Sequence, residues 1–157
     1  MITLLADSNA LRHPGLKAYL QASRDHAIAL SDLTLVEMRK TRALSTSRES
    51  LQIVAYYAQQ SYALRRTHEM LGDNITSQEE THVLFDYEAT AYLAGLARRL
   101  LTLPPPDDLV EEMAQHEADA QLIIARLTEE VSALEPGLRL WGFTYSCGCD
   151  SSCGWIV

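Results

Sequence analysis

The sequence predicts an α/β fold, with a small parallel sheet in the first part of the chain and a long helical hairpin in the second. Two short apolar runs, residues 2–6 and 26–30, have the length of buried strands, and a helical segment separates them. Strand, helix, strand and helix within about forty residues are typical of parallel strands joined by right-handed crossovers. From about residue 77, apolar residues recur every three or four positions, which indicates helices.

The first strand ends at Asp7, and the residues His13-Pro14-Gly15 form the turn before the first helix. After the second strand, Ser31 or Asp32 caps a helix that carries Glu37. A right-handed crossover brings the carboxyl ends of the two strands to the same edge of the sheet. We therefore expect Asp7 and the start of this second helix to lie at one edge.

A third helix is predicted to open at Thr46, because Thr46 and Glu49 have the spacing of a capping box. Residues 62–64 are either a short third strand or the end of that helix. A second capping box, formed by Ser77 and Glu80, opens the first arm of the hairpin. The sheet is thus predicted within the first seventy residues.

Three prolines, residues 104–106, separate the two arms of the hairpin, which spans about residues 77–135. The second arm begins at Asp107 or Asp108 and is expected to end at Pro136-Gly137. Residues 141–157 are rich in Gly, Ser and Cys and show no periodicity. Residues 1–140 are therefore predicted to form one domain and residues 141–157 a tail.

The composition is that of a globular protein: 157 residues, 47% hydrophobic, with a formal net charge of −8. No apolar run approaches the roughly 18 residues of a membrane span, and no secretory leader is recognisable, so we expect a cytoplasmic location. Residues 1–70 hold nine basic and six acidic side chains, whereas residues 71–157 hold four and fifteen. This balance argues against a general nucleic-acid coat and places any anion contact in the first half.

Asp7 and Glu37 are the residues most suggestive of chemistry. Two carboxylates at the carboxyl end of a parallel sheet suit a hard cation such as Mg²⁺ or Mn²⁺. Asn9 is placed to support a carboxylate or a metal-bound water. Spacing alone leaves open a plainer interpretation, in which Asp7 only terminates a strand and Glu37 lies on a solvated helix face.

Residues 4–11, Leu-Leu-Ala-Asp-Ser-Asn-Ala-Leu, resemble the opening of PIN-domain ribonucleases, whose first strand ends in Asp-x-Asn or Asp-x-Ser. Residues 30–40 are similar to the second motif of that family, in which a Glu follows the second strand at this distance. The resemblance implies a PIN-type sheet and a metal-dependent endoribonuclease that cleaves single-stranded RNA. It further implies that Asp7 and Glu37 are catalytic acids and ligands of Mg²⁺ or Mn²⁺, with Asn9 in support. Some members of the family are toxins that a partner protein neutralises.

The family supplies further Asp residues from a later strand–helix segment, the first of them opening an Ala-rich helix. Asp86 and Asp119 are the two candidates here, but both fall within helical patterns and are interpreted as solvated helix acids. The clear resemblance covers about residues 1–40. It therefore predicts a truncated domain that stops before the remaining acids and that is inactive if nothing replaces them.

A non-catalytic interaction module on a degenerate PIN scaffold is the main alternative, with the acidic helices pairing with another protein or a second copy.

The pattern Glu79-x-x-His82 suggests a di-iron bundle, but such bundles need that motif twice. Three cysteines lie close together in the tail, Cys147, Cys149 and Cys153. They could form a site for a soft metal ion, but the lack of a fourth ligand nearby favours free thiols. Four basic residues that follow Glu37 are placed to meet RNA phosphates, namely Arg39, Lys40, Arg42 and Arg48. For Arg39 and Lys40, an interaction with the helix end is the alternative.

Overall fold

The computed structural model describes residues 2–66, 84–140, 144–146 and 154–156, with side chains as far as residue 133. The chain divides into two compact units, residues 1–121 and residues 122–157. The predicted capping box at Ser77 and Glu80, the Glu79-x-x-His82 pattern and the three cysteines lie outside the described residues.

The first unit contains a four-stranded sheet with the order β1-β2-β3-β4. Its strands are β1 (Ile2–Leu5), β2 (His26–Leu30), β3 (Ser61–Leu64) and β4 (Phe85–Asp86). β1, β2 and β3 run parallel, which confirms an α/β fold, and residues 62–64 belong to a strand. β4 is antiparallel to β3, so the prediction of a purely parallel sheet is wrong. The rings of Tyr62 and Phe85, 4.9 Å apart between centroids, hold these two strands together.

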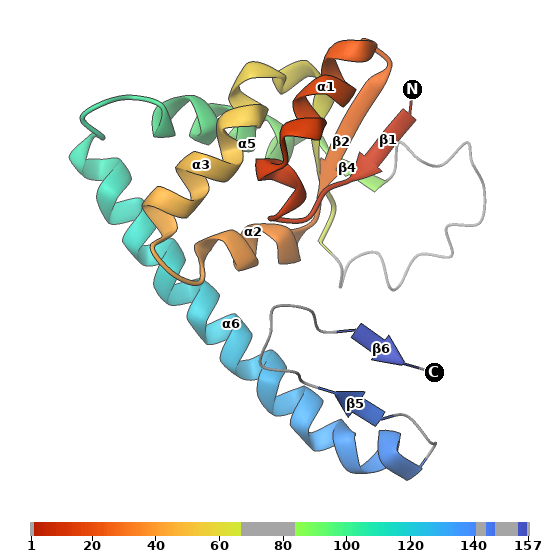
Figure 1. Cartoon of the computed structure of the whole chain (residues 1–157). Coiled ribbons are helices and arrows are strands. Elements are labelled where there is room, and N and C mark those ends of the chain that lie inside the picture. The colour runs from red at the N-terminus through yellow and green to blue at the C-terminus, as the bar shows by residue number, and fades with distance from the viewer. Residues whose placement is uncertain (1, 67–83, 141–143, 147–153, 157) are drawn as a thin grey trace. The chain divides into compact units, whose positions relative to one another are not determined.

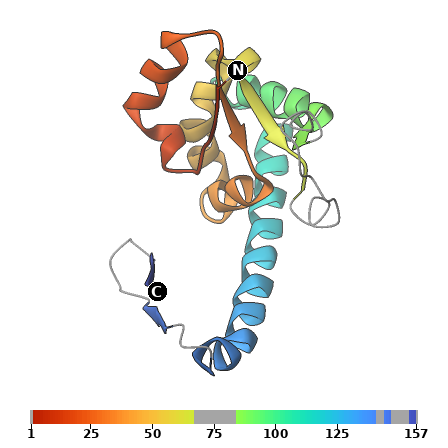
Figure 2. The same cartoon turned by 90° about the vertical axis from the view of Figure 1, so that its right-hand side faces the viewer.

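The helices of the first unit are α1 (Pro14–Ala22), α2 (Asp32–Arg39), α3 (Ala43–Tyr56), α5 (Tyr87–Leu100) and the first part of α6 (Asp107–Leu140). Right-handed crossovers that advance in one direction along a sheet place their helices on one face. α1 and α3 accordingly lie on the same side of β1 and β2 (Figure 1). Figure 2 shows the first unit from the side that lies at the right of Figure 1, where β1, β2 and β3 are visible.

One hydrophobic core joins this sheet face to the helices. Ile28 and Leu30 of β2 are completely buried in it. The helices contribute Leu16 and Leu20 of α1, Met38 of α2, Leu51 and Val54 of α3, Leu93, Leu96 and Leu100 of α5, and Leu109 and Met113 of α6. Burying an aliphatic side chain contributes roughly 1.5–3 kcal/mol. The core therefore fixes the strand ends at which the candidate site lies.

Residues 101–106 join α5 to α6, but α5 begins ten residues after the predicted start of the hairpin at residue 77, because residues 85–86 form β4. α5 begins at Tyr87, because Asp86 accepts a hydrogen bond from the backbone N–H of Ala89 and caps it. α6 extends to Leu140, so the predicted end at Pro136-Gly137 is wrong. Nothing in the described contacts explains why the helix continues past Pro136.

The second unit contains the rest of α6 and two short strands, β5 (Thr144–Ser146) and β6 (Gly154–Ile156). The strands pair antiparallel, with Tyr145 opposite Trp155. The tail thus contains regular structure that its composition did not predict. Within the described residues, no helix combines the length and the apolar character needed to span a membrane.

Candidate functional site

Asp7 lies one residue beyond the last contact between β1 and β2. The backbone N–H of Ala6 still donates to the carbonyl oxygen of Ala29, at 3.0 Å. The chain then turns around Asp7. Its side-chain Oδ1 accepts a hydrogen bond from the backbone N–H of Ala10, at 2.6 Å, and its carbonyl oxygen accepts one from Leu11, at 3.2 Å. The Asp7 side chain is therefore oriented at the carboxyl end of β1 while it remains exposed.

The second motif is attached to the same end of β1. Ser31 caps α2, as predicted, by accepting a hydrogen bond from the backbone N–H of Thr34. The Thr34 hydroxyl donates to the carbonyl oxygen of Ala6 at 3.2 Å, and this contact is buried. Because side chains three residues apart share a helix face, Glu37 follows Thr34 at the same end of the sheet.

Ser8, the neighbour of Asp7 in the sequence, contacts Glu37. Its hydroxyl donates a hydrogen bond of 2.7 Å to Oε2 of Glu37, and only 4% of Ser8 is exposed. Glu37 thus lies one hydrogen bond from the residue that follows Asp7, although it is thirty positions away in the sequence. The sequence analysis did not single out Ser8. Its position in the Asp-Ser-Asn turn was the available signal, but a serine in a turn is common.

Asn9 does not support a carboxylate in this arrangement. Its Oδ1 accepts a hydrogen bond from Nη2 of Arg12, at 3.2 Å, and Arg12 also donates from Nε to the carbonyl oxygen of Ser8. The hydrogen bond to a predicted acid therefore comes from Ser8 and not from Asn9. Arg12 in turn brings a positive charge to the exposed turn beside Asp7.

The two further acids, Asp86 and Asp119, have hydrogen-bond partners of their own. Asp86 ends β4 and caps α5, so its placement within a helical pattern is wrong. Asp119 lies on the exposed surface of α6, where it accepts a hydrogen bond from the side chain of Gln115. In the part of the chain that the structure describes, no three His, Cys, Asp or Glu side chains form a group able to hold a metal ion. Asp7 and Glu37 each follow a parallel strand at its carboxyl end, and Glu37 accepts a hydrogen bond from Ser8, the neighbour of Asp7.

Two of the four basic residues after Glu37 have side chains that are partly buried against other parts of the fold. Arg48 donates from Nε to the carbonyl oxygen of Leu100, at 2.7 Å. Nε and Nη2 of Arg39 are buried, and burial lowers the pKa of this guanidinium, while the nearby Tyr92 and Glu112 oppose that effect. Arg39 and Arg48 are therefore unsuited to meeting RNA phosphates.

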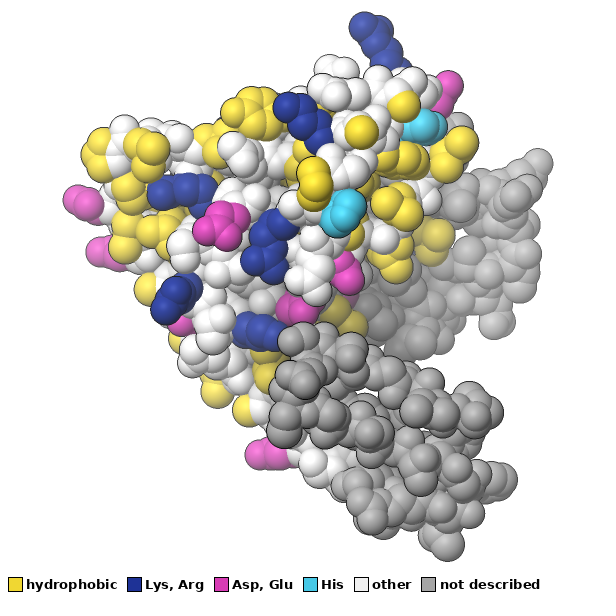
Figure 3. Space-filling model, viewed as in Figure 1, with side chains coloured by type: hydrophobic (Ala, Val, Ile, Leu, Met, Phe, Trp, Pro, Cys, Tyr) yellow, Lys and Arg dark blue, Asp and Glu magenta, His cyan; other side chains and the backbone are white. Residues whose placement is uncertain are grey.

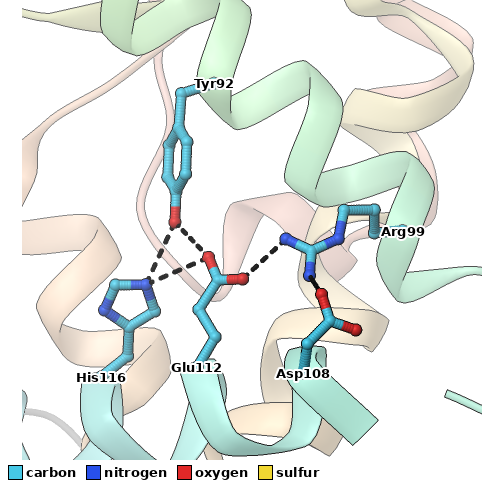
Figure 4. Close-up of polar contacts among 5 residues, drawn as sticks. All are labelled: Tyr92, Arg99, Asp108, Glu112 and His116. Atoms are coloured by element: carbon cyan, nitrogen blue, oxygen red, sulfur yellow. Dashed lines mark hydrogen bonds and ion pairs between the residues drawn. The ribbon is translucent and has the colours of Figure 1, made fainter. Parts of the chain in front are cut away.

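A second polar cluster joins α5 to the beginning of α6 (Figure 4). Glu112 lies at its centre. It accepts hydrogen bonds from the Tyr92 hydroxyl at 2.7 Å and from Nη1 of Arg99 at 2.6 Å. Arg99 also pairs with Asp108, and the Tyr92 hydroxyl lies 3.1 Å from Nε2 of His116. Side chains from two helices thus share one carboxylate.

The pKa values of Glu112 and His116 are shifted toward the protonation states that preserve this cluster. The hydrogen bond from Tyr92, followed by that from Arg99, lowers the pKa of Glu112 and keeps it ionised. Burial, followed by the charge of Arg39, lowers the pKa of His116 and favours its neutral form. Because these groups satisfy one another across the two helices, the cluster fastens α6 to α5.

Comparisons of the chain with protein-family models, with curated proteins and with solved structures found no match.

Proposed function

We infer that the chain is a divalent-metal-dependent ribonuclease of the PIN type, in which Asp7 and Glu37 hold one Mg²⁺ or Mn²⁺ ion. The hydrogen bond from Ser8 to Glu37 is the observation that carries this proposal. It joins the two motifs that the resemblance is built on, at the carboxyl end of parallel strands, where ligands collect in α/β folds. Both carboxylates are exposed and open to a cation.

The donor set fits the proposed ion. Mg²⁺ is commonly bound through one or two carboxylates, with waters and substrate phosphates completing its octahedral shell. When bound, such an ion binds a phosphate oxygen and lowers the pKa of a coordinated water. The chain's own part is to orient the ligands: the N–H of Ala10 holds Asp7, and Ser8 holds Glu37. Arg12, at the same turn, is placed to meet a phosphate of the RNA.

Asp86 gives secondary support. The resemblance includes an Asp that opens an Ala-rich helix, and Asp86 caps α5, whose sequence contains Ala89, Ala91, Ala94 and Ala97. Asp86 lies opposite Ala63, which pairs with Leu30 at the carboxyl end of β2. Asp86 therefore belongs to the same region of the sheet edge, although its carboxylate caps the helix.

A non-catalytic interaction module is the second candidate. The absence of a third acidic ligand among the described side chains favours it. So do the exposed aliphatic side chains of α6, among them Leu122, Leu127 and Val131, which are 70%, 40% and 52% exposed. Apolar side chains repeated along a helix surface are typical of helix-pairing proteins.

Cleavage of a labelled single-stranded RNA separates the two candidates. We expect the purified chain to cut the RNA in the presence of Mn²⁺, and to lose this activity when EDTA removes the ion. RNA that stays intact over a range of Mn²⁺ concentrations would favour the interaction module. Activity that persists in EDTA would contradict the proposed metal site.

A further inference from the structure

A groove runs between α1 and α3, and we call it the α1–α3 groove. Its volume of about 810 Å³ lies within the roughly 300–1,000 Å³ of sites that bind small molecules. One wall is formed by α1 and the turn before it, and the other by side chains of α3 that stand three and four positions apart and share a helix face. Among the lining residues are Arg12, His13, Lys17, Glu49, Gln52 and Tyr56.

The α1–α3 groove presents two charged groups and one aromatic ring that have no partner among the described residues. Lys17 and Glu49 form no ion pair there, and the ring of Tyr56 stacks on no other ring. Tyr56 is 68% exposed. Figure 3 shows basic side chains among hydrophobic ones over α1 and α3. The groove therefore offers a cation, an acceptor and an open ring to one ligand.

The α1–α3 groove adjoins the candidate site. His13 lines both this groove and the smaller cavity, of about 520 Å³, that Asp7 lines. Arg12 lines the groove and also donates to the carbonyl oxygen of Ser8 and to Oδ1 of Asn9. A polymer bound in the groove therefore passes the turn that carries Asp7.

We propose that the α1–α3 groove holds one guanine nucleotide of a single-stranded RNA, near the phosphate that the metal site cleaves. The inference rests on the proposed function for its choice of RNA as the ligand. Arg12 and Lys17 meet the phosphates, whose negative charge they complement. The base stacks on Tyr56, as bases do on exposed aromatic rings of proteins that bind single strands.

Glu49 and Gln52 select guanine. A carboxylate only accepts hydrogen bonds, and guanine alone of the four RNA bases presents two adjacent N–H donors on its Watson–Crick edge, beside a carbonyl oxygen. Glu49 accepts from these donors, and the amide of Gln52 donates to the carbonyl oxygen. Uracil has one N–H between two carbonyl oxygens and sets an acceptor against the carboxylate. This assignment also accounts for an acid in a groove whose other charges favour an anion.

Binding of short labelled RNAs in EDTA tests the guanine contact, because without a metal ion the RNA stays intact. Fluorescence anisotropy compares a run of uracils with the same run containing one guanine. We expect the guanine to tighten binding to the parent chain about tenfold. Glu49→Gln should abolish this preference without weakening binding of the uracil run, since it removes a negative charge. Glu111→Gln removes an exposed acid of α6 and should retain the preference.

The stacking and phosphate contacts have their own variants. Tyr56→Ala should weaken binding of both RNAs about tenfold, because the base loses its stacking surface. Tyr87→Ala removes a ring of α5 that is 58% exposed and should leave binding unchanged. Lys17→Ala should reduce the slope of log affinity against log salt by about 0.7, the value for one phosphate of a single strand. Arg24→Ala, which removes an exposed charge beyond α1, should leave the slope unchanged. Circular dichroism checks that each variant folds.

Equal affinity of the parent chain for the two RNAs, or equal weakening by Tyr56→Ala and Tyr87→Ala, would overturn the proposal. The binding readout is separate from cleavage. If the variants of the groove behave as expected but no RNA is cut with Mn²⁺, the nuclease proposal fails and the groove stands. If the parent chain cuts RNA but binds both RNAs equally, the groove proposal fails and the nuclease proposal stands.

Discussion

Replacement of Asp7 by Asn is expected to lower the rate of Mn²⁺-dependent RNA cleavage by about a hundredfold or more, because the metal loses one of its two charged ligands. Stability should change little. An Asn side chain retains an oxygen that can accept the hydrogen bond from Ala10, since Asp and Asn cap helix starts about equally well. Glu37→Gln should lower the cleavage rate in the same way, because it removes the other charged ligand. It should leave stability nearly unchanged, because its amide oxygen can still accept the hydrogen bond from Ser8.

Asp25→Asn is the matched control for this loss. Asp25 is an exposed acid that precedes β2, at the amino end of the parallel strands. Its replacement removes the same charge at the opposite edge of the sheet and should leave cleavage unchanged. Rates are measured under single-turnover conditions, and thermal melting confirms that each variant folds. An Asp7→Asn variant that cleaves as fast as the parent would remove Asp7 from the mechanism.

Glu112→Ala is expected to lower the free energy of unfolding by about 2 kcal/mol, because it removes an acceptor shared by two donors and a counter-charge near the buried Arg39. The value lies below that of a fully buried ion pair, because the side chain of Glu112 remains 26% exposed and water screens part of the interaction. Urea unfolding followed by circular dichroism measures the change.

Glu111→Ala provides the control for the loss of a negative charge and of a helix side chain. Glu111 is adjacent to Glu112 on α6 but is exposed. Its replacement should change the free energy of unfolding by less than about 0.5 kcal/mol. Equal destabilisation by the two substitutions would show that the cluster around Glu112 does not fasten α6 to α5.

Local sequence signals predicted the elements whose contacts are local. The apolar runs of β1 and β2 were located to within one residue, and the cap formed by Ser31 is confirmed. The N-cap of α3 was predicted at Thr46, four residues after the observed N-cap, Arg42. α3 begins at Ala43 because its N–H donates to the carboxylate of Glu117, 74 residues away, at 2.8 Å. A cap supplied by a distant helix has no local pattern.

The candidate site was predictable only in part, because some of its contacts are local and others join distant residues. The edge that Asp7 and Glu37 share followed from right-handed crossover geometry. The hydrogen bond between Ser8 and Glu37 did not, since it depends on the turn that directs Ser8 inward. β4 was missed because two residues show no periodicity and their pairing with β3 is long-range. Arg39 was misjudged because its burial depends on α5 and α6 rather than on its neighbours in α2.

Binding of Mn²⁺ measured by calorimetry or by electron paramagnetic resonance tests the central claim most directly, because it asks whether two carboxylates joined through Ser8 share one ion. The account predicts one bound Mn²⁺ per chain, lost in Asp7→Asn and in Glu37→Gln and retained in Asp25→Asn. Equal binding by all four proteins, or no binding by the parent chain, would contradict it.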